Sequence, residues 1–256
     1  MPDFKLFIKK CASSCAVFLI FMSVSAAEEP LVTANELTYY SEIYPPMNYT
    51  KSGVAVGASV EMLEEMWKVM NIDPQIILIQ PWARAYRNSL NEPNAVLFTM
   101  SRTQGREKLF KWVGPIVSTT HILIARKDAN IRIDNIEDSF NYRVATIQND
   151  ISELALLNMG FPTINMQKLT SLDQSIQMLN VKRVDMMLLT KAALSSLLTR
   201  HRLLITDFEI VFDVKRVDSY FAFNKKVPDS VINKFQKAFN LIEPQRIEIL
   251  DRYQLN

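Results

Sequence analysis

The sequence predicts an α/β protein of two lobes, each built on a mostly parallel sheet flanked by helices. Short apolar runs of strand length alternate with amphipathic stretches of helical spacing, which is the pattern of β-α-β units. The alternation occurs once before Gly114-Pro115 and again after it. Low-complexity segments, short-period repeats and long linkers are absent from the sequence. We therefore expect two successive sheets in one continuous chain.

The first 27 residues are predicted to be a secretory signal peptide. A start containing three lysines precedes an apolar run at 11–24, which is shorter than the roughly 20 residues that cross a bilayer. Small residues at 23–27 then form an Ala-x-Ala-like arrangement, which predicts cleavage after Ala26 or Ala27. An uncleaved anchor is the alternative. The mature, exported chain is thus expected to comprise residues 28–256, enough for one large domain or two lobes.

Loss of this segment leaves a chain with balanced charge and no cysteine. It removes three of the 29 lysines and arginines and one of the 27 acidic residues, which leaves 26 of each. Nucleic acid is therefore not an expected partner, because binding to phosphates needs a basic surplus or patch. Both cysteines, Cys11 and Cys15, leave with the segment. The mature chain can form no disulfide, and its stability must come from an ordinary apolar core.

The first half of the chain reads as β-α-β-α-β. Two prolines in the segment 41–49 cannot continue a strand ladder, so this segment is expected to be a loop. Strand 76–79 is apolar at every position, which is typical of a strand covered on both faces. Pro81 stands where a helix begins, the place where its missing N–H costs nothing. The expected elements are strands at 37–40, 76–79 and 95–98, a helix from Ala58 with apolar residues through Met70, and a helix from Pro81.

Hydroxyl and guanidinium groups follow the third strand. Ser101, Arg102, Thr103 and Arg106 come directly after it, and the segment is expected to stop at Gly114-Pro115. Ligands of open α/β sheets bind at the carboxyl ends of strands. Arginine meets a carboxylate or phosphate with two parallel hydrogen bonds, so we expect an anionic ligand here. The neighbouring strand-to-helix junction adds two more candidates to the same rim, Trp82 and Arg84.

The second half repeats the β-α-β pattern, and its first strands are expected to form a second sheet. A helix starting between Gln148 and Ile151 would present free N–H groups, which makes this turn a second candidate anion site. Gly160 is expected to close that helix at the C′ position, and Ser171–Gln174 is a capping box for the next. The expected elements are strands at 121–125, 143–147, 184–189 and 219–223, and an amphipathic helix after Pro228-Asp229.

This order of features resembles the family 3 extracellular solute-binding proteins, the two-lobed receptors of ABC importers for polar amino acids. The resemblance covers essentially the whole mature chain. It rests on the signal peptide, Tyr44–Met47, Gly57 before its helix, Ser101-x-Thr103-x-x-Arg106, Trp112–Pro115, Arg143–Gln148, Lys182–Asp185 and Tyr220–Lys225. It implies a two-lobed periplasmic binding protein fold with a cleft and a hinge between the lobes, in the periplasm, without catalysis, metal or cofactor.

The resemblance also implies the domain boundaries and the partner. Residues 28–117 would form the first lobe, 118–218 the second, and 219–256 would return to the first. A small ligand would bind in the cleft, and the lobes would close over it by hinge motion. The closed form would then be recognised by the permease of an ABC importer or, alternatively, by a separate sensor receptor in the membrane. A monomer is the expected oligomeric state.

Site residues are likewise carried over from the family. Arg106 matches the arginine that clamps the ligand α-carboxylate; its alternative is a surface ion pair with a neighbour such as Glu107. The loop 148–151 matches the second-lobe loop whose amides complete the anion site. Tyr39, Tyr44, Trp82 and Trp112 are candidates for aromatic walls or for core packing. The expected ligand-binding residues are Arg106, Ser101, Thr103, Arg102, Arg84, Trp82, Tyr39, Tyr44, Asn149, Asp150 and Thr190.

One departure from the family concerns the ligand amine. The family commonly holds it with an aspartate a few residues beyond Asp185, and the same spacing here reaches Leu189 or Thr190. Neither residue can neutralise an ammonium group. Either Glu42 or Asp150 holds the amine instead, or the ligand has none.

Two alternatives bear on the ligand and the activity. Arg84 and Arg102 point towards a ligand with more than one anionic group, unless they are solvated or paired within the protein. A small-acid dehydratase-like enzyme on the same fold is the weakest alternative. The only histidines are His121 and His201, and neither lies in a metal-binding or catalytic motif.

Overall fold

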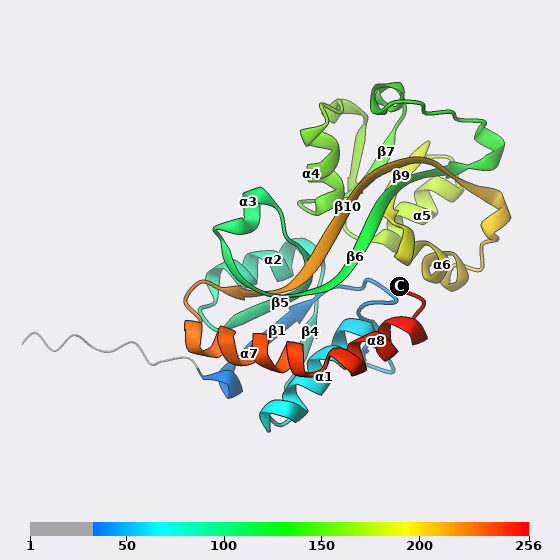
Figure 1. Ribbon diagram of the computed structural model, residues 1–256. Coiled ribbons are helices and arrows are strands. Elements are labelled where there is room, and N and C mark those ends of the chain that lie inside the picture. Colours follow the sequence, from blue (N-terminus) through cyan, green and yellow to red (C-terminus); the bar gives the residue numbers. More distant parts are fainter. Residues whose placement is uncertain (1–32, 256) are drawn as a thin grey trace, which may run out of the picture. The chain divides into compact units, whose positions relative to one another are not determined.

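The computed structural model describes residues 33–255, and the predicted signal peptide lies outside them. An eight-stranded sheet organises this part of the chain, with the strand order β4-β1-β5-β10-β6-β9-β7-β8 (Figure 1). Its strands are β1 (Thr38–Ser41), β4 (Ile77–Ile79), β5 (Ala95–Ser101), β6 (Phe110–Arg126), β7 (Val144–Ile147), β8 (Met166–Leu169), β9 (Met186–Thr190) and β10 (Phe208–Asn224). A separate hairpin pairs β2 (Tyr49–Lys51) with β3 (Val54–Val56).

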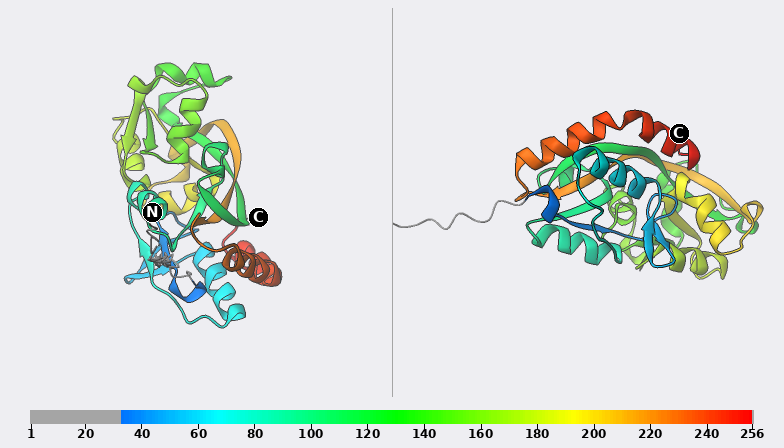
Figure 2. Two further views of the ribbon diagram at one scale, coloured as in Figure 1. Left: turned by 90° about the vertical axis from the view of Figure 1, so that its left-hand side faces the viewer. Right: turned by 90° about the horizontal axis from the view of Figure 1, so that it is seen from below.

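Helices flank this sheet. They are α1 (Ala58–Met70), α2 (Trp82–Asn91), α3 (Gln104–Glu107), α4 (Ile151–Asn158), α5 (Leu172–Asn180), α6 (Lys191–Arg200), α7 (Asp229–Leu241) and α8 (Glu243–Arg252). Short 3-10 turns occupy Ala34–Glu36, Lys127–Ala129, Ile136–Asn141, Thr163–Asn165 and Ile205–Asp207. The first and last of the long amphipathic helices pack together, since α1 contacts α7 and α8 (Figure 2). Helix α2 instead packs against β1, β5 and β10.

The parallel pairings confirm the β-α-β reading of each half. Strand β1 pairs in parallel with β4 and β5, and β7 pairs in parallel with β8 and β9. The expectation of two separate sheets is wrong, because β6 and β10 join both halves into one sheet. These two strands of 17 residues each are antiparallel to one another and run through the middle of the molecule (Figure 1).

Gly114-Pro115 does not end a strand, contrary to expectation. Strand β6 continues through this pair, whose peptide bond is cis. The ladder between β6 and β10 shifts register opposite this point, between Ser219 and Phe221, so the missing proline N–H breaks no regular pairing. The Gly114 N–H instead donates to the Gln236 side chain, at 3.2 Å. Strand β10 begins at Phe208, well before the expected strand at 219–223, because it pairs with β6 as far as Arg126.

Local signals located the helix ends well. Pro81 precedes α2, Ser171 Oγ accepts a hydrogen bond from the Gln174 N–H at the start of α5, and Gly160 has a φ of 81° after α4. Helix α6 was not expected; the Thr190 hydroxyl caps it by accepting from the Ala193 N–H. Helix α8, with a proline in its first turn, was not expected either.

The apolar interior forms three clusters. One is built by α1, α7 and α8 around Leu63, Trp67 and Phe235, and another by α4 and β7 around Leu156 and Phe161. The remaining cluster contains residues of β5 and α2 together with residues of β9, α5 and α6. It therefore joins segments that are far apart in the sequence.

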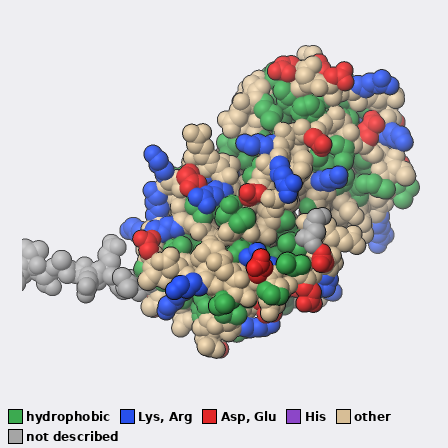
Figure 3. Space-filling model, viewed as in Figure 1, with side chains coloured by type: hydrophobic (Ala, Val, Ile, Leu, Met, Phe, Trp, Pro, Cys, Tyr) green, Lys and Arg blue, Asp and Glu red, His purple; other side chains and the backbone are tan. Residues whose placement is uncertain are grey.

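The exterior is mixed in charge. On the face shown in Figure 3, lysines and arginines are interspersed with acidic side chains rather than gathered by sign. Among residues 33–255, no helix has the length and apolar character needed to cross a membrane.

Candidate functional site

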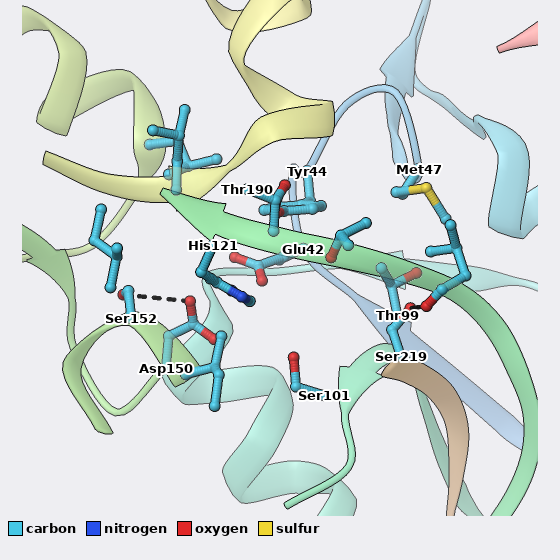
Figure 4. A pocket seen from close by; sticks show the side chains of 16 residues that line it. Glu42, Tyr44, Met47, Thr99, Ser101, His121, Asp150, Ser152, Thr190 and Ser219 are labelled. Carbon is cyan, nitrogen blue, oxygen red and sulfur yellow. Dashed lines mark hydrogen bonds between the residues drawn. The ribbon is translucent and has the colours of Figure 1, made fainter. Parts of the chain in front are cut away.

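A small cavity lies where several strands of the large sheet end. Its volume is about 30 Å³, roughly two to three times the 10–15 Å³ that one water molecule requires. Figure 4 shows the side chains around this space. Those labelled there are Glu42, Tyr44, Met47, Thr99, Ser101, His121, Asp150, Ser152, Thr190 and Ser219.

The sheet brings these residues together. Glu42 follows β1, Ser101 ends β5, and Thr190 ends β9. Asp150 precedes α4, just after β7. Because these strands present their carboxyl ends to the same region, polar groups from both halves of the chain meet there, as expected for open α/β sheets. His121 on β6 joins them, since it pairs with Thr190 in the sheet.

Arg106 is buried beside this cavity and forms no ion pair with a carboxylate of residues 33–255. Only 3% of the residue is exposed, and its guanidinium lies 5.0 Å from the ring centre of Trp82 and 5.2 Å from that of Tyr86. It donates to the carbonyl oxygens of Ser101 and Asn149, each at 3.3 Å, while its Nε has no partner within the described residues. Burial lowers the pKa of Arg106, although Asp150 nearby opposes this. The alternative of a surface ion pair for Arg106 is therefore wrong.

Hydrogen bonds close the space between the two halves of the chain. The Asn149 carbonyl accepts from Trp82 Nε1 at 2.8 Å as well as from Arg106. Asn149 has a left-handed backbone, with φ of 60°, and its N–H donates to Glu153. The Tyr44 and Thr190 hydroxyls also bond to one another. A molecule the size of an amino acid can enter only when these contacts open.

Two carboxylates and an imidazole give the cavity its electrostatic character. Burial, and then the nearby charge of Asp150, raise the pKa of Glu42 well above its usual range, with Arg106 opposing. Burial lowers the pKa of His121, so its ring is neutral. The cavity is thus lined by two acids, an imidazole, several hydroxyl groups and apolar side chains, and the cation Arg106 lies just outside it.

Several predicted site residues lie at or next to the cavity. Four of them line it, namely Ser101, Tyr44, Asp150 and Thr190. Three more adjoin it through the hydrogen bonds described above, namely Arg106, Trp82 and Asn149. Thr103 precedes α3 and lines an outer groove instead.

The other predicted residues lie elsewhere. Tyr39 is completely buried in the α1 cluster, where its hydroxyl accepts from Trp67 Nε1 at 3.0 Å, so it is a core residue and not a wall of the cavity. Arg84 is exposed on α2. Arg102 forms an ion pair with Glu107 at 2.6 Å on the surface. Neither arginine lines the cavity, although Arg102 lines the same outer groove as Thr103. A ligand with several anionic groups stays a prediction.

Trp112 packs against other aromatic side chains, whereas His121 faces the cavity. Trp112 packs edge-on against Phe110 and Tyr220, so it is a packing residue. His121 lies in no recognisable motif, yet it is 4% exposed and faces the cavity. Only its pairing opposite Thr190 brings it there, and the sequence contains no local signal for that pairing.

The match to a family model agrees with this architecture. Bacterial extracellular solute-binding proteins, family 3, match residues 38–244, which is most of the chain. No curated protein sequence matches the chain.

Solved structures share the fold at low sequence identity. A histidine kinase sensor domain with similarity to periplasmic binding proteins has a TM-score of 0.78 at 16% identity, covering 86% of this chain and 96% of the other. A mutant of ArgBP from T. maritima has a TM-score of 0.74 at 14% identity, covering 86% and 96%. The arginine-, lysine-, histidine-binding protein ArtJ from Geobacillus stearothermophilus has a TM-score of 0.71 at 14% identity, covering 85% and 99%.

These findings confirm the predicted fold class, a two-lobed periplasmic binding protein fold with mixed α/β structure. They also confirm the resemblance drawn from the sequence motifs. The chain belongs to the bacterial extracellular solute-binding proteins, family 3.

Proposed function

We propose that this protein captures a small carboxylate-bearing, amino acid-like solute between two closing lobes. The lobes would be those expected from the sequence, residues 28–117 with 219–256, and residues 118–218. The observation that carries the proposal is Arg106, a buried guanidinium without a carboxylate partner among the described residues, located where segments of both lobes meet. The role is binding and delivery, without catalysis.

The surroundings of Arg106 favour an incoming carboxylate. A buried cation is costly unless it is paired and hydrogen-bonded. Two carbonyl contacts of 3.3 Å, the Tyr86 side chain and the nearby charges of Asp150 and Glu42 compensate Arg106 only in part, since burial still lowers its pKa. A ligand carboxylate could replace the Asn149 carbonyl and meet the guanidinium with two parallel bonds. Trp82 and Tyr86 hold the guanidinium in place through their ring faces.

The cavity favours an amine on the same ligand. Glu42 and Asp150 line it from different lobes, and Thr190 stands where the family commonly has an aspartate. Two acids facing one space suit a cationic group better than a second anion. An amino acid-like ligand could therefore place its carboxylate at Arg106 and its ammonium between Glu42 and Asp150.

Delivery to the permease of an ABC importer is the proposed role of the closed form, in the periplasm and as a monomer. Support comes from family membership and from the fold shared with the substrate binding protein of an amino acid ABC transporter. The fold shared with a histidine kinase sensor domain favours a second candidate, delivery to a membrane sensor. Uptake of labelled ligand by cells with and without the protein separates the two, because only an importer component would be required for uptake.

A thermal-shift screen tests the proposed capture directly. Amino acids, dicarboxylates and small phosphorylated acids are each added to the mature protein, and the melting temperature is recorded. We expect one or more amino acids to stabilise it, by about 2.7 kcal/mol at 100 times the dissociation constant. If phosphorylated acids or dicarboxylates alone stabilise the protein, the proposed ligand class is wrong; turnover of any compound would contradict the non-catalytic role.

A further inference from the structure

Three ionisable side chains from different elements line the cavity: Glu42 after β1, His121 on β6 and Asp150 before α4. Arg106 on α3 interacts electrostatically with both acids from outside the cavity, and the Tyr44 hydroxyl faces them from the loop after β1. Glu153 lies behind Asp150 on α4, but Lys168 neutralises it at 2.6 Å. The charge balance of the cavity therefore depends on Glu42, Asp150, His121 and Arg106.

His121 presents a hydrogen-bond acceptor to the cavity. Nδ1 of its ring is buried without a partner within the described residues, and Lys215 is its neighbour across the ladder to β10. A neutral imidazole has one donor nitrogen and one acceptor nitrogen, and the tautomer with its hydrogen on Nε2 presents the Nδ1 lone pair to the cavity. Figure 4 shows the ring of His121 pointing into the space that Glu42 and Asp150 share.

Full ionisation would leave this region with one uncompensated negative charge. Glu42 and Asp150 would carry two charges, and Arg106 supplies one positive charge. A cavity of about 30 Å³ has room for little water to solvate the excess. Glu42 and Asp150 are half-buried, and two like charges that face one small space disfavour the ionisation of both.

Glu42 is the residue that takes the proton. Asp150 lies at the N-terminus of α4, where free N–H groups favour a negative charge, and it accepts a hydrogen bond from Ser152 Oγ at 3.5 Å. The Glu42 carboxylate has no such donor among its described contacts. Burial and the charge of Asp150 both act on Glu42 in the same direction, since both raise its pKa.

We propose that the empty cavity stores one proton on Glu42, and that a ligand of net positive charge enters in exchange for it. The inference rests on the proposed function, because it assumes that the ligand carboxylate binds Arg106. The matching ligand has one carboxylate and two cationic groups, which is an amino acid with a basic side chain. Its carboxylate and the two protein acids then balance Arg106 and its own two cations.

The exchange conserves charge and protons. The O–H bond of Glu42 breaks, the proton passes to solvent, and a cationic group of the ligand takes its place. Glu42, Asp150 and His121 Nδ1 together offer three acceptor sites, which suits an ammonium group with its three N–H donors. A neutral amino acid brings one cation fewer, so Glu42 keeps its proton and none is released.

The exchange predicts a specific pH dependence. Protons compete with the ligand for Glu42, so affinity for a basic amino acid falls as the pH falls below the raised pKa of Glu42. Above that pKa the affinity levels off, because no proton remains to be displaced. A ligand with a net negative charge would show the opposite trend, because its binding would require an additional proton.

Isothermal titration calorimetry tests the exchange. Lysine is compared with norleucine, which lacks only the terminal ammonium, and arginine with citrulline, which carries a neutral urea group. Titrations in phosphate and in Bis-Tris buffer, which both buffer at about pH 6 and differ in ionisation enthalpy, give the number of protons released. At about pH 6, we expect lysine or arginine to bind at least about tenfold more tightly than its neutral analogue. We also expect binding to release about one proton.

Glu42→Gln supplies the variant test. Glutamine keeps the shape of the protonated acid but cannot release a proton, so the preference for the basic amino acid and the proton release should both disappear. Glu64→Gln, the same change on the exposed face of α1, should leave both unchanged. The proton count of the unmodified protein is decisive even if Glu42→Gln fails to fold.

Two results separate this inference from the proposed function. If norleucine or L-glutamate binds as tightly as the basic amino acids, or if no proton is released, the exchange is wrong. Arg106-dependent binding of those compounds would then still support carboxylate capture. If no compound with an α-carboxylate binds, the proposed function falls, and the exchange falls with it.

Discussion

Replacing Arg106 with alanine is expected to abolish ligand-induced thermal stabilisation while leaving the unliganded protein folded. The ligand carboxylate would lose the buried cation that pairs with it, and removal of one partner of a buried charged pair costs about 2–5 kcal/mol of affinity. The unliganded protein loses two weak carbonyl bonds and the contacts with the rings of Trp82 and Tyr86. That loss should cost about 1 kcal/mol. Thermal-shift titration with the best amino acid of the screen measures both effects.

Arg84→Ala is the matched control. Arg84 is also an arginine near the start of a helix in the same part of the chain, but it is exposed and does not face the cavity. Its replacement should leave ligand affinity unchanged. Equal ligand affinities of the Arg106→Ala variant and the unmodified protein would exclude Arg106 as the carboxylate partner.

Gly57→Ala is expected to destabilise the protein and weaken ligand binding together. Gly57 has a φ of 125°, and a Cβ atom there would lie 2.5 Å from the Met47 carbonyl oxygen and 2.8 Å from that of Pro46. These are backbone atoms of the loop that carries Tyr44 and Met47 into the cavity. Backbone strain alone costs about 1–3 kcal/mol, and the clash adds to it by displacing the loop. Chemical denaturation and ligand titration measure the two effects.

Gly105→Ala provides the contrast for Gly57. Gly105 lies in α3 next to Arg106, has no unusual φ, and a Cβ atom there meets nothing within 4 Å. Alanine in its place should preserve both stability and binding. A Gly57→Ala protein that matched Gly105→Ala in both measurements would show that the loop tolerates displacement and does not shape the site.

The sequence predicted the fold class and most elements because their signals are local. The 3.6-residue period of Val60, Leu63 and Met66 identifies α1, and Ser171 and Gly160 mark helix ends by their own chemistry. The length of β6 and β10 could not be predicted in this way. Gly114-Pro115 resembles a strand end, and only the register shift in the partner strand shows how the ladder passes it.

The candidate site was predictable where strand ends determine it. Ser101, Asp150 and Thr190 follow or end strands whose carboxyl ends meet, so their convergence follows from the β-α-β pattern. The burial and the partners of the arginines were not predictable, because they depend on contacts between residues that are distant in the sequence. Arg102 pairs with Glu107, whereas Arg106 turns inward between Trp82 and Tyr86. The position of Tyr39 was not predictable for the same reason. Its hydroxyl accepts a hydrogen bond from Trp67 Nε1 on α1, which places it in the core and not in the site.

The central claim is that Arg106 binds the ligand through a carboxylate. The most direct measurement compares, by calorimetry, the best amino acid of the screen with its carboxamide, in which an amide replaces the α-carboxylate and the rest is unchanged. We predict that the carboxamide binds about 30-fold to several thousandfold more weakly, the equivalent of about 2–5 kcal/mol. Equal affinity of the two compounds would contradict the claim.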